Sequence, residues 1–394
     1  MKTKHNLILY TFLFLLPFCG FAQNDLPSVW AQIERNNLTL QAVQQQVTAL
    51  KIENKIGLTP ENPEVEFAYL WGNPSAVGNR MDFSVTQSFD FPLVYAQKSK
   101  IANLKNEQSD LEYKKEQRAV YEQAGKLYYH IVYQNVRIND MQTCLGHLTG
   151  IAHSYQKKLE AGEITIFDYN KVRLTALNME QELRHAETER EALLLELSQL
   201  NGGKMIDITT AEFPNMEFTS DFEQWYSQIE KNNPMLAWLH KEMEINEKQI
   251  RLSQASWAPQ LMAGYMREQI PSESFQGIKV GITLPLWNNL NTIKQKKMQN
   301  SAINMMIYDE KNQFFNHLKT QFTLVSNLGQ QIASYQTALE EISQFDLLLE
   351  ALEKGEIDLV NYLLEYSIYH ESHERLFEMQ LDAAQKYLEL QLYE

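Results

Sequence analysis

The sequence is poor in cysteine, with only Cys19 and Cys144 among its 394 residues. At most one disulfide could form within the chain, so the fold does not depend on a network of cross-links. After residue 22 the sequence also lacks any run that approaches the ~18 to 20 apolar residues of a membrane-spanning helix. A passage through a membrane would therefore have to use strands.

Positive charge is also scarce. The chain has 35 Lys and Arg residues against 50 Asp and Glu residues, which gives a formal net charge of −15. Nucleic-acid binding requires a basic surface, so this composition argues against it. The acidic balance agrees with a cation path or, more simply, with a solvated surface.

Sequence motifs for catalysis are absent as well. There is no Gly-rich phosphate loop, no nucleophile elbow and no Cys/His cluster with metal-ligand spacing. His370 and His373 lie three residues apart, whereas the zinc-protease motif places its histidines four apart on one helix face. Two such histidines could chelate a metal weakly, but solvated or packed positions are the better interpretation. We expect no enzyme, no cofactor and no metal site.

The N-terminus has the organisation of a secretory signal peptide, predicted over residues 1–22. Two lysines precede an apolar run that ends at Phe18, and small residues stand at −3 and −1 of a cleavage site after Ala22. Cleavage would leave Cys144 as the only cysteine. Lipidation of Cys19 is the alternative, although the bulky Phe18 before it disfavours that signal.

The remaining sequence consists of two similar halves. Asn36-Asn37 recurs as Asn232-Asn233, and the turn sequence Gly-Glu-Ile occurs once in each half. Each half reads as helix, two strands, long helix, Gly-containing turn and helix, which indicates an internal duplication. The predicted organisation is a first repeat at residues 23–201, a connector at residues 202–221 that crosses the outside of the helices, and a second repeat at residues 222–394.

The long helices give the strongest periodic signal. Apolar residues recur every three or four positions over residues 120–159, 169–200 and 314–349. A sustained repeat of this kind is typical of coiled-coil packing along a narrow seam. The segment 92–160 could form one helix about 100 Å long at 1.5 Å per residue. That length exceeds what a globular domain needs, so this helix is expected to span a distance.

Four segments with alternating apolar and polar residues predict two β-hairpins. The first hairpin is expected to have strands at residues 64–71 and 81–91, joined by a turn at 72–80. The second is expected to have strands at residues 260–267 and 278–284, joined by a turn at 269–276. Each predicted strand has an apolar face opposite a more polar one. The apolar positions are Val65, Phe67, Tyr69, Trp71, Phe83, Val85, Phe89, Phe91, Ile278, Val280, Ile282 and Leu284.

These apolar faces could cover the core of a soluble sheet or could face lipid. Two features favour lipid. The predicted strands are about nine to eleven residues long, as in tilted membrane strands, and the helices already pair with one another through their heptads. Four strands cannot close into a barrel, and open sheet edges do not survive in hydrocarbon. Several chains must therefore contribute strands to one wall.

Together these features resemble the TolC family of outer-membrane efflux proteins over essentially the whole mature chain. Short signatures accompany the architecture: Asn-Pro-Glu at 62–64 opens the first strand, and Gly-Ile-Thr-Leu-Pro-Leu at 281–286 closes the last. The first signature and residues 277–291 look most like the heavy-metal branch of the CzcC and CusC type.

The resemblance implies a mainly α fold with a small β part. Three identical chains would each give four membrane strands to a twelve-stranded β-barrel in the outer membrane of a Gram-negative bacterium, with lipid outside. Their coiled-coil helices would form an α-barrel tunnel across the periplasm. The implied partners are a periplasmic adaptor (a membrane fusion protein) and an inner-membrane pump of the resistance-nodulation-division type. The chain would be a passive export duct for heavy-metal cations or, alternatively, for drugs or proteins.

In the family, the adaptor docks on the turns at the tip of the tunnel. Carried over to this sequence, the docking residues are Gly162, Glu163, Ile164, Gly355, Glu356 and Ile357. Some relatives close the tip with rings of aspartates after the second turn, where this chain has Asn361 and Leu364. A three-fold ring of carboxylates at a constriction would concentrate cations. The gate candidates are therefore Asp168, Asp358, Asn361 and Glu365.

An alternative of a different class is a periplasmic coiled-coil scaffold or adaptor in which the strands form a small soluble domain. The duplicated, Phe-rich strand pairs favour the channel. The two hypotheses differ in one structural expectation. In the scaffold, Phe83, Val85 and Phe89 would lie beneath helices of their own chain, whereas in the channel they would not.

Overall fold

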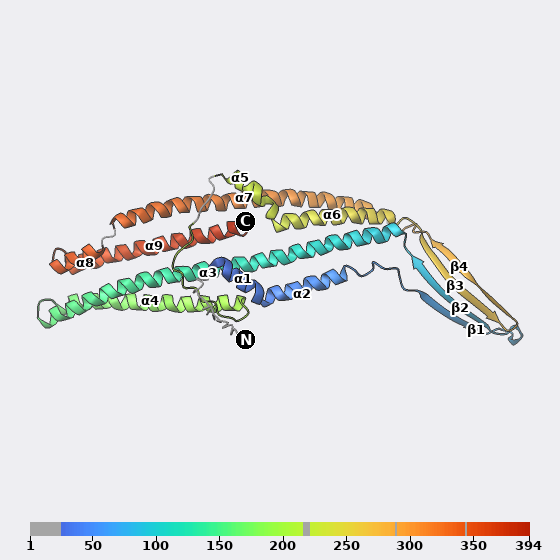
Figure 1. The fold of residues 1–394 in the computed structure, drawn as a ribbon, viewed down its shortest axis with the longest axis horizontal. Helices are drawn as coiled ribbons and strands as arrows, with labels where there is room; N and C mark the ends of the chain where they lie inside the picture. Colours follow the sequence, from blue (N-terminus) through green and yellow to red (C-terminus); the bar gives the residue numbers. More distant parts are fainter. Residues whose placement is uncertain (1–24, 216–220, 288–289, 343–344) are drawn as a thin grey trace, which may run out of the picture.

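The computed structural model describes residues 25–215, 221–287, 290–342 and 345–394. The predicted signal peptide and residues 216–220 of the predicted connector lie outside these ranges. Long helices extend from a four-stranded sheet at one end of the molecule to two helix–helix turns at the other (Figure 1). None of the described helices combines the length and the apolar character that crossing a membrane would take.

Residues 25–201 of the first half form four α-helices and a β-hairpin. Its longest element begins with proline at the first helical position. Proline is tolerated there because an N–H group at this position would have no hydrogen-bond partner within the helix. That element has 69 residues and is about 100 Å long at 1.5 Å per residue, as expected for residues 92–160. In order the elements are α1 (Leu26–Asn36), α2 (Leu38–Glu53), β1 (Glu64–Leu70), the 3₁₀ turn η1 (Ser75–Val77), β2 (Arg80–Phe89), α3 (Pro92–Glu160) and α4 (Ile166–Leu200).

The second half repeats the order of helix, two strands, long helix and returning helix. The repeated Asn-Asn pair has the same local role in both halves. The side chain of Asn37 caps α2 by accepting the Leu40 N–H at 2.8 Å, and that of Asn233 accepts the Leu236 N–H at 3.1 Å. The elements are α5 (Phe222–Ile229), η2 (Glu230–Asn232), α6 (Pro234–Ala255), β3 (Gln260–Ile270), β4 (Glu273–Thr283), α7 (Thr292–Ile342), α8 (Phe345–Lys354) and α9 (Leu359–Gln391).

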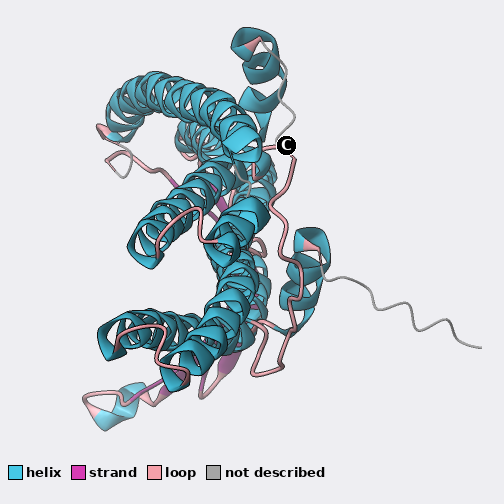
Figure 2. Ribbon diagram, turned by 90° about the vertical axis from the view of Figure 1, so that its left-hand side faces the viewer, coloured by secondary structure: helices cyan, strands magenta, loops and turns pink. Residues whose placement is uncertain are grey.

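The helices lie side by side in a curved row. Helix α3 contacts α2 and α6 in the part nearer the sheet, and α4 and α9 in the part nearer the turns, while α7 contacts α6 and α9. Seen from the end with the helix turns, the row curves and leaves one side open (Figure 2). The accessible surface is 25915 Å², well above the roughly 16,000 Å² of a compact monomer of this mass. The chain therefore leaves a large surface uncovered.

The core is a series of apolar seams between neighbouring helices. One seam joins α1, α3, α4 and the end of α9, and a second joins α5, α6 and α7. The described part of the predicted connector packs on the first seam, where Ile206 and Ile208 are buried. Asn135 of α3 donates to the carbonyl of Ile208 at 2.9 Å, which fastens this segment to the helices.

The four strands form one antiparallel sheet in the order β1-β2-β3-β4. The turn expected over residues 269–276 is wrong: β3 continues to Ile270 and β4 starts at Glu273, which leaves only Pro271 and Ser272 between the strands. The strand tips are polar except for Ile270 and Phe275, so no regular alternation marks them in the sequence.

Three predicted strand residues lie just beyond strand ends. Trp71 follows β1, which has seven residues and is shorter than expected, and Leu284 follows β4. Phe91 is the N-cap residue of α3, because Pro92 begins that helix. In each case the alternation in the sequence continues past the point where backbone pairing stops.

Candidate functional site

The apolar strand residues form one continuous face across all four strands. Residues that pair directly across antiparallel strands point to the same side of a sheet, and the register pairs Val65 with Val85, Val85 with Tyr265 and Tyr265 with Ile278. The remaining members follow from the same register: Phe67, Tyr69, Phe83, Phe89, Leu261, Val280 and Ile282.

This apolar face is not covered by the helices. The sheet lies beyond the end of the helical row (Figure 1), and Phe67, Ile278 and Val280 are 68%, 83% and 76% exposed. Phe83 and Phe89 are each 40% exposed, and Val85 is half-buried. The arrangement expected of the soluble scaffold, with these residues beneath helices of their own chain, is therefore absent from the described structure.

The opposite face of the sheet is polar and internally paired. Near the tip, Arg80 forms ion pairs with Asp82 at 2.8 Å and with Glu268 of β3 at 2.5 Å. Ser84 donates to the carboxylate of Glu66 at 3.2 Å across the β1–β2 pair. One face thus matches an apolar medium and the other matches water.

The two outer strands leave open edges. β1 pairs only with β2, and β4 pairs only with β3, among the residues that the structure describes. An edge strand presents unpaired N–H and C=O groups that can pair with another chain. The sheet is therefore incomplete at both sides.

The two predicted docking turns lie at the same end of the molecule, opposite the sheet (Figure 1). Gly162 joins α3 to α4 with φ of 76°, and Gly355 joins α8 to α9 with φ of 75°, a conformation that favours glycine. The N–H groups of Glu163 and Glu356 bond back to the carbonyls of Lys158 and Ala351 at 2.8 and 2.9 Å. Both glutamates are exposed, whereas Ile164 and Ile357 are half-buried.

Three of the four gate candidates take part in helix caps beside these turns. Thr165 caps α4 and donates its hydroxyl to Asp168 at 2.6 Å, and this hydrogen bond is the main cause that lowers the pKa of Asp168. Asp358 caps α9 by accepting the Asn361 N–H at 2.8 Å. Glu365 lies about two turns further along α9 and is exposed.

A groove that the sequence did not predict lies close to the tip. It has a volume of about 260 Å³ and lies between α3 and α8, lined by residues that include Ile151, Tyr155 and Leu352. Gly146 and Gly150 also line it, and nothing within 4 Å would meet a Cβ on either one. Two glycines four apart on one helix are the sequence signal that could have predicted it.

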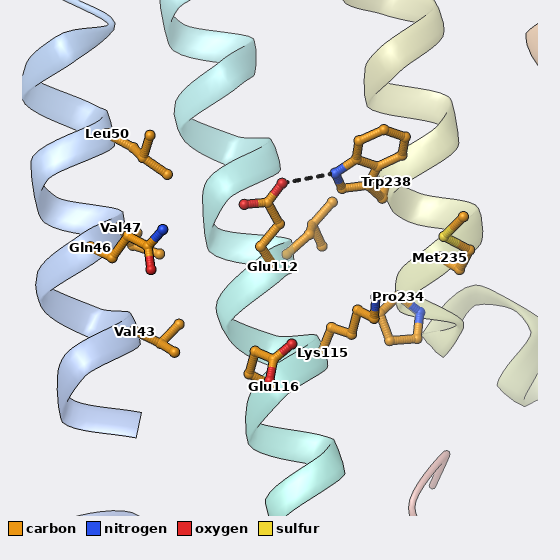
Figure 3. Close-up of a pocket in the computed structure, with 11 residues that line it drawn as sticks. Val43, Gln46, Val47, Leu50, Glu112, Lys115, Glu116, Pro234, Met235 and Trp238 are labelled. Atoms are coloured by element: carbon orange, nitrogen blue, oxygen red, sulfur yellow. Dashed lines mark hydrogen bonds between the residues drawn. The ribbon is translucent and has the colours of Figure 1, made fainter. Parts of the chain in front are cut away.

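A second, larger groove of about 450 Å³ opens over α3 between α2 and α6 (Figure 3). Val43, Val47 and Leu50 of α2 form its apolar side, and Trp238 of α6 faces them and donates to Glu112 at 3.4 Å. This groove results from α2 and α6 flanking α3 on two sides. It brings together none of the predicted site residues.

A cluster of possible metal ligands, also not predicted from the sequence, lies between α3 and α9. His370 and His373 of α9 lie against Asp140 of α3, and Cys144 is one turn further along α3. The sequence shows Asp140 and Cys144 four residues apart on one helix face. It does not show that this face meets α9, because the pairing of helices is a tertiary property.

The similarity of this chain to known proteins lies in its fold. No protein-family model matches the sequence, and no curated protein sequence matches it significantly. Among solved structures, CusC, studied for folding and transmembrane channel formation, aligns with a TM-score of 0.77 and 14% identity over 94% of this chain and 92% of CusC.

Two further solved structures are similar. The outer-membrane channel OprN aligns with a TM-score of 0.74 and 10% identity over 93% of this chain and 89% of OprN. The Campylobacter jejuni CmeC outer membrane channel aligns with a TM-score of 0.69 and 15% identity over 93% and 85% of the two chains. The near-equal scores of CusC and OprN do not single out a heavy-metal branch. At such low identities the likeness establishes the fold: this chain has the architecture of outer-membrane channel protomers, mainly helical with a four-stranded antiparallel sheet.

Proposed function

We propose that this chain is the outer-membrane component of a tripartite export system in a Gram-negative bacterium, and that it acts as a passive duct. The carrying observation is the sheet, whose apolar face is exposed across all four strands at the end of helices about 100 Å long. Uncovered apolar strands are stable where lipid replaces a protein core. The helices would then extend from the outer membrane into the periplasm.

We propose that three chains close into one channel. The open edges of β1 and β4 lie on opposite sides of the sheet, and the helical row also has two flanks, α2 with α4 on one side and α7 on the other. Head-to-tail contacts between unlike flanks generate a ring when the rotation closes. The four strands of each chain would then join a closed wall, a β-barrel with the polar faces inside.

The lipid contact in this proposal uses the residues predicted for it. They are Val65, Phe67, Tyr69, Phe83, Val85, Phe89, Ile278, Val280 and Ile282 within the strands, with Trp71, Phe91 and Leu284 at the strand ends. Trp71 and Tyr69 lie close together near one end of β1, with ring centroids 5.4 Å apart. Aromatic pairs in such positions suit the interface between lipid and water.

We propose that a periplasmic adaptor docks at the two turns, Gly162 to Ile164 and Gly355 to Ile357, and links the duct to an inner-membrane pump. The groove lined by Gly146 and Gly150 lies close to these turns and supports the assignment, because a protruding adaptor side chain could fill it. Gly150→Leu should fill the groove from within and lower the recovery of the adaptor in a pull-down by about tenfold. An unchanged pull-down would remove the groove from the docking site.

The cargo proposed from the sequence resemblance is a heavy-metal cation, and the alternatives are drugs or proteins. A strain that lacks the gene should become sensitive to divalent metal salts and regain resistance with the gene restored. Sensitivity to hydrophobic drugs instead, or loss of a secreted protein, would assign the other cargo classes.

The main experiment separates a membrane channel from a soluble scaffold. The channel should remain in the membrane after osmotic shock, dissolve only in detergent, run as a heat-labile oligomer and conduct ions in a planar bilayer. Release by osmotic shock as a soluble monomer would overturn the proposal. No enzymatic activity takes part in this function.

A further inference from the structure

The cluster between α3, α4 and α9 has the composition of a metal site. It combines a carboxylate, a thiol and an imidazole, from Asp140, Cys144 and His370, and one ligand atom from each lies within 4.8 Å of the others. Cys144 is 4% exposed, and the side chains of Asp140 and His370 are 14% and 15% exposed. These groups are therefore removed from most of the water that would otherwise solvate them.

Two of the distances lie close to the edges of a tetrahedron around one ion, one within the expected range and one just above it. Bond lengths of about 2.0 to 2.3 Å to a tetrahedral zinc ion place neighbouring ligand atoms about 3.3 to 3.8 Å apart. Here Asp140 Oδ2 lies 3.6 Å from His370 Nδ1 and 3.9 Å from Cys144 Sγ. The first distance is too long for a good hydrogen bond, and the Nδ1 atom is buried without one among the described residues.

The other ring nitrogen of His370 faces a second carboxylate. His370 Nε2 lies 3.6 Å from the Glu182 carboxylate of α4, on the side of the ring away from Asp140. That distance is also too long for a good hydrogen bond, but the Glu182 side chain is 55% exposed, so a small rotation would let it accept this N–H, as carboxylates do beside metal-bound histidines. A further imidazole is adjacent, since His373 Nδ1 lies 3.2 Å from Asp140 Oδ1.

We propose that Asp140, Cys144 and His370 bind a divalent transition-metal ion of borderline softness, with Zn²⁺ as the best match. His373 is the nearest candidate for a fourth ligand, and Glu182 is a positioning residue that orients His370. The mixed oxygen, sulfur and nitrogen donors favour zinc-like ions over Mg²⁺ or Ca²⁺, which prefer oxygen alone. The bound ion would join α3 of the first half to α9 of the second. This inference does not depend on the channel function.

Cobalt substitution tests the site directly. The full-length oligomer, purified in detergent and treated with a chelator, is titrated with Co²⁺. We expect about one Co²⁺ per chain, a thiolate-to-cobalt charge-transfer band in the near ultraviolet, and displacement by Zn²⁺, which binds such sites more tightly. If the wild-type protein binds no Co²⁺, or binds it without the charge-transfer band, the proposal is wrong.

Variants then identify the ligands. Cys144→Ser should abolish the charge-transfer band, and His370→Gln and Glu182→Gln should each weaken Zn²⁺ binding by about 10- to 100-fold. His185→Gln, an exposed histidine on the same helix as Glu182, is the matched control and should bind as the wild type does. Circular dichroism verifies that each variant remains helical. A charge-transfer band that survives in Cys144→Ser would overturn the assignment, and the wild-type spectrum stands as a test even if a variant fails to fold.

Discussion

At the scale of single residues, the positions that repeat between the halves are those that begin and end helices. Asn37 and Asn233 cap α2 and α6 through the same type of hydrogen bond. Gly162 and Gly355 have positive φ at the two turns. Caps and left-handed glycines depend on local backbone geometry, so short sequence motifs can reveal them without knowledge of the tertiary fold.

Asp358 is both the N-cap residue of α9 and a gate candidate, and two substitutions can distinguish these roles. Asp358→Ala removes both the cap and the charge, and should lower the stability of the helical tip by about 1 kcal/mol. Asp358→Ser keeps an N-cap oxygen but removes the charge. If Asp358 acts in a gate, both variants should lower the preference for cations in single-channel recordings, whereas only Asp358→Ala should lower the temperature of thermal unfolding.

Thr165→Ala provides the matched control, because Thr165 caps α4 at the equivalent turn without carrying a charge. It should reduce stability about as much as Asp358→Ala, within a factor of two or three. Ion preference should stay unchanged, because loss of the Thr165 hydrogen bond removes only an effect that lowers the pKa of Asp168 and leaves this carboxylate ionised at neutral pH. Normal conductance and ion preference in Asp358→Ser, together with Glu365→Ala and Asp168→Ala, would exclude these carboxylates from the gate.

At the scale of elements, the alternation of apolar and polar residues in the sheet is visible in the sequence, whereas the pairing between strands of the two hairpins is not. Lysine at a position that we propose to face lipid should test the pattern. Val85→Lys puts a charge on the apolar face, which costs about 2 to 4 kcal/mol near the middle of a membrane. The adjacent change Ser84→Lys puts the same charge on the polar face, where Glu66 can pair with it.

The readout for this pair is the amount of heat-labile oligomer in isolated outer membranes. We expect Val85→Lys to reduce it strongly and Ser84→Lys to leave it near the wild-type level. Equal amounts for the two variants would mean that the two faces of β2 meet similar surroundings, which contradicts a lipid-facing sheet.

The elements also show how far the sequence could predict this structure. Strict alternation predicted β2, and the heptad pattern together with Pro92 predicted the whole of α3. The tip of the second hairpin was mispredicted, because residues 269–276 are mostly polar, contain Pro271 and show no regular alternation. The cluster of Asp140 with His370 was missed because it depends on which face of α3 meets α9. The division at residues 201 and 222 stays a prediction, although the order of elements agrees with it.

At the scale of the whole molecule, exposed apolar residues lie on two different flanks of the helical row. Along α7, Met298, Met305 and Tyr308 are spaced by seven and three residues and are 63%, 74% and 79% exposed. That spacing is a coiled-coil seam without a partner helix in this chain as described. On the opposite flank, Leu38 and Ile52 of α2 are 69% and 62% exposed. Two unlike apolar flanks suit a ring of identical chains better than a symmetric dimer.

The seam on α7 therefore provides the test of the ring. Met305→Glu combined with Tyr308→Asp places two charges where a neighbouring helix should pack, and a buried unpaired charge costs several kcal/mol. We expect monomers in native mass spectrometry in place of trimers, with the helix content of each chain retained. Asn304→Glu, at an exposed polar position beside the seam, should leave the trimer intact. Trimers that survive the double change would mean that α7 does not meet a neighbouring chain, and the contact between chains would then have to be made by the sheet edges alone.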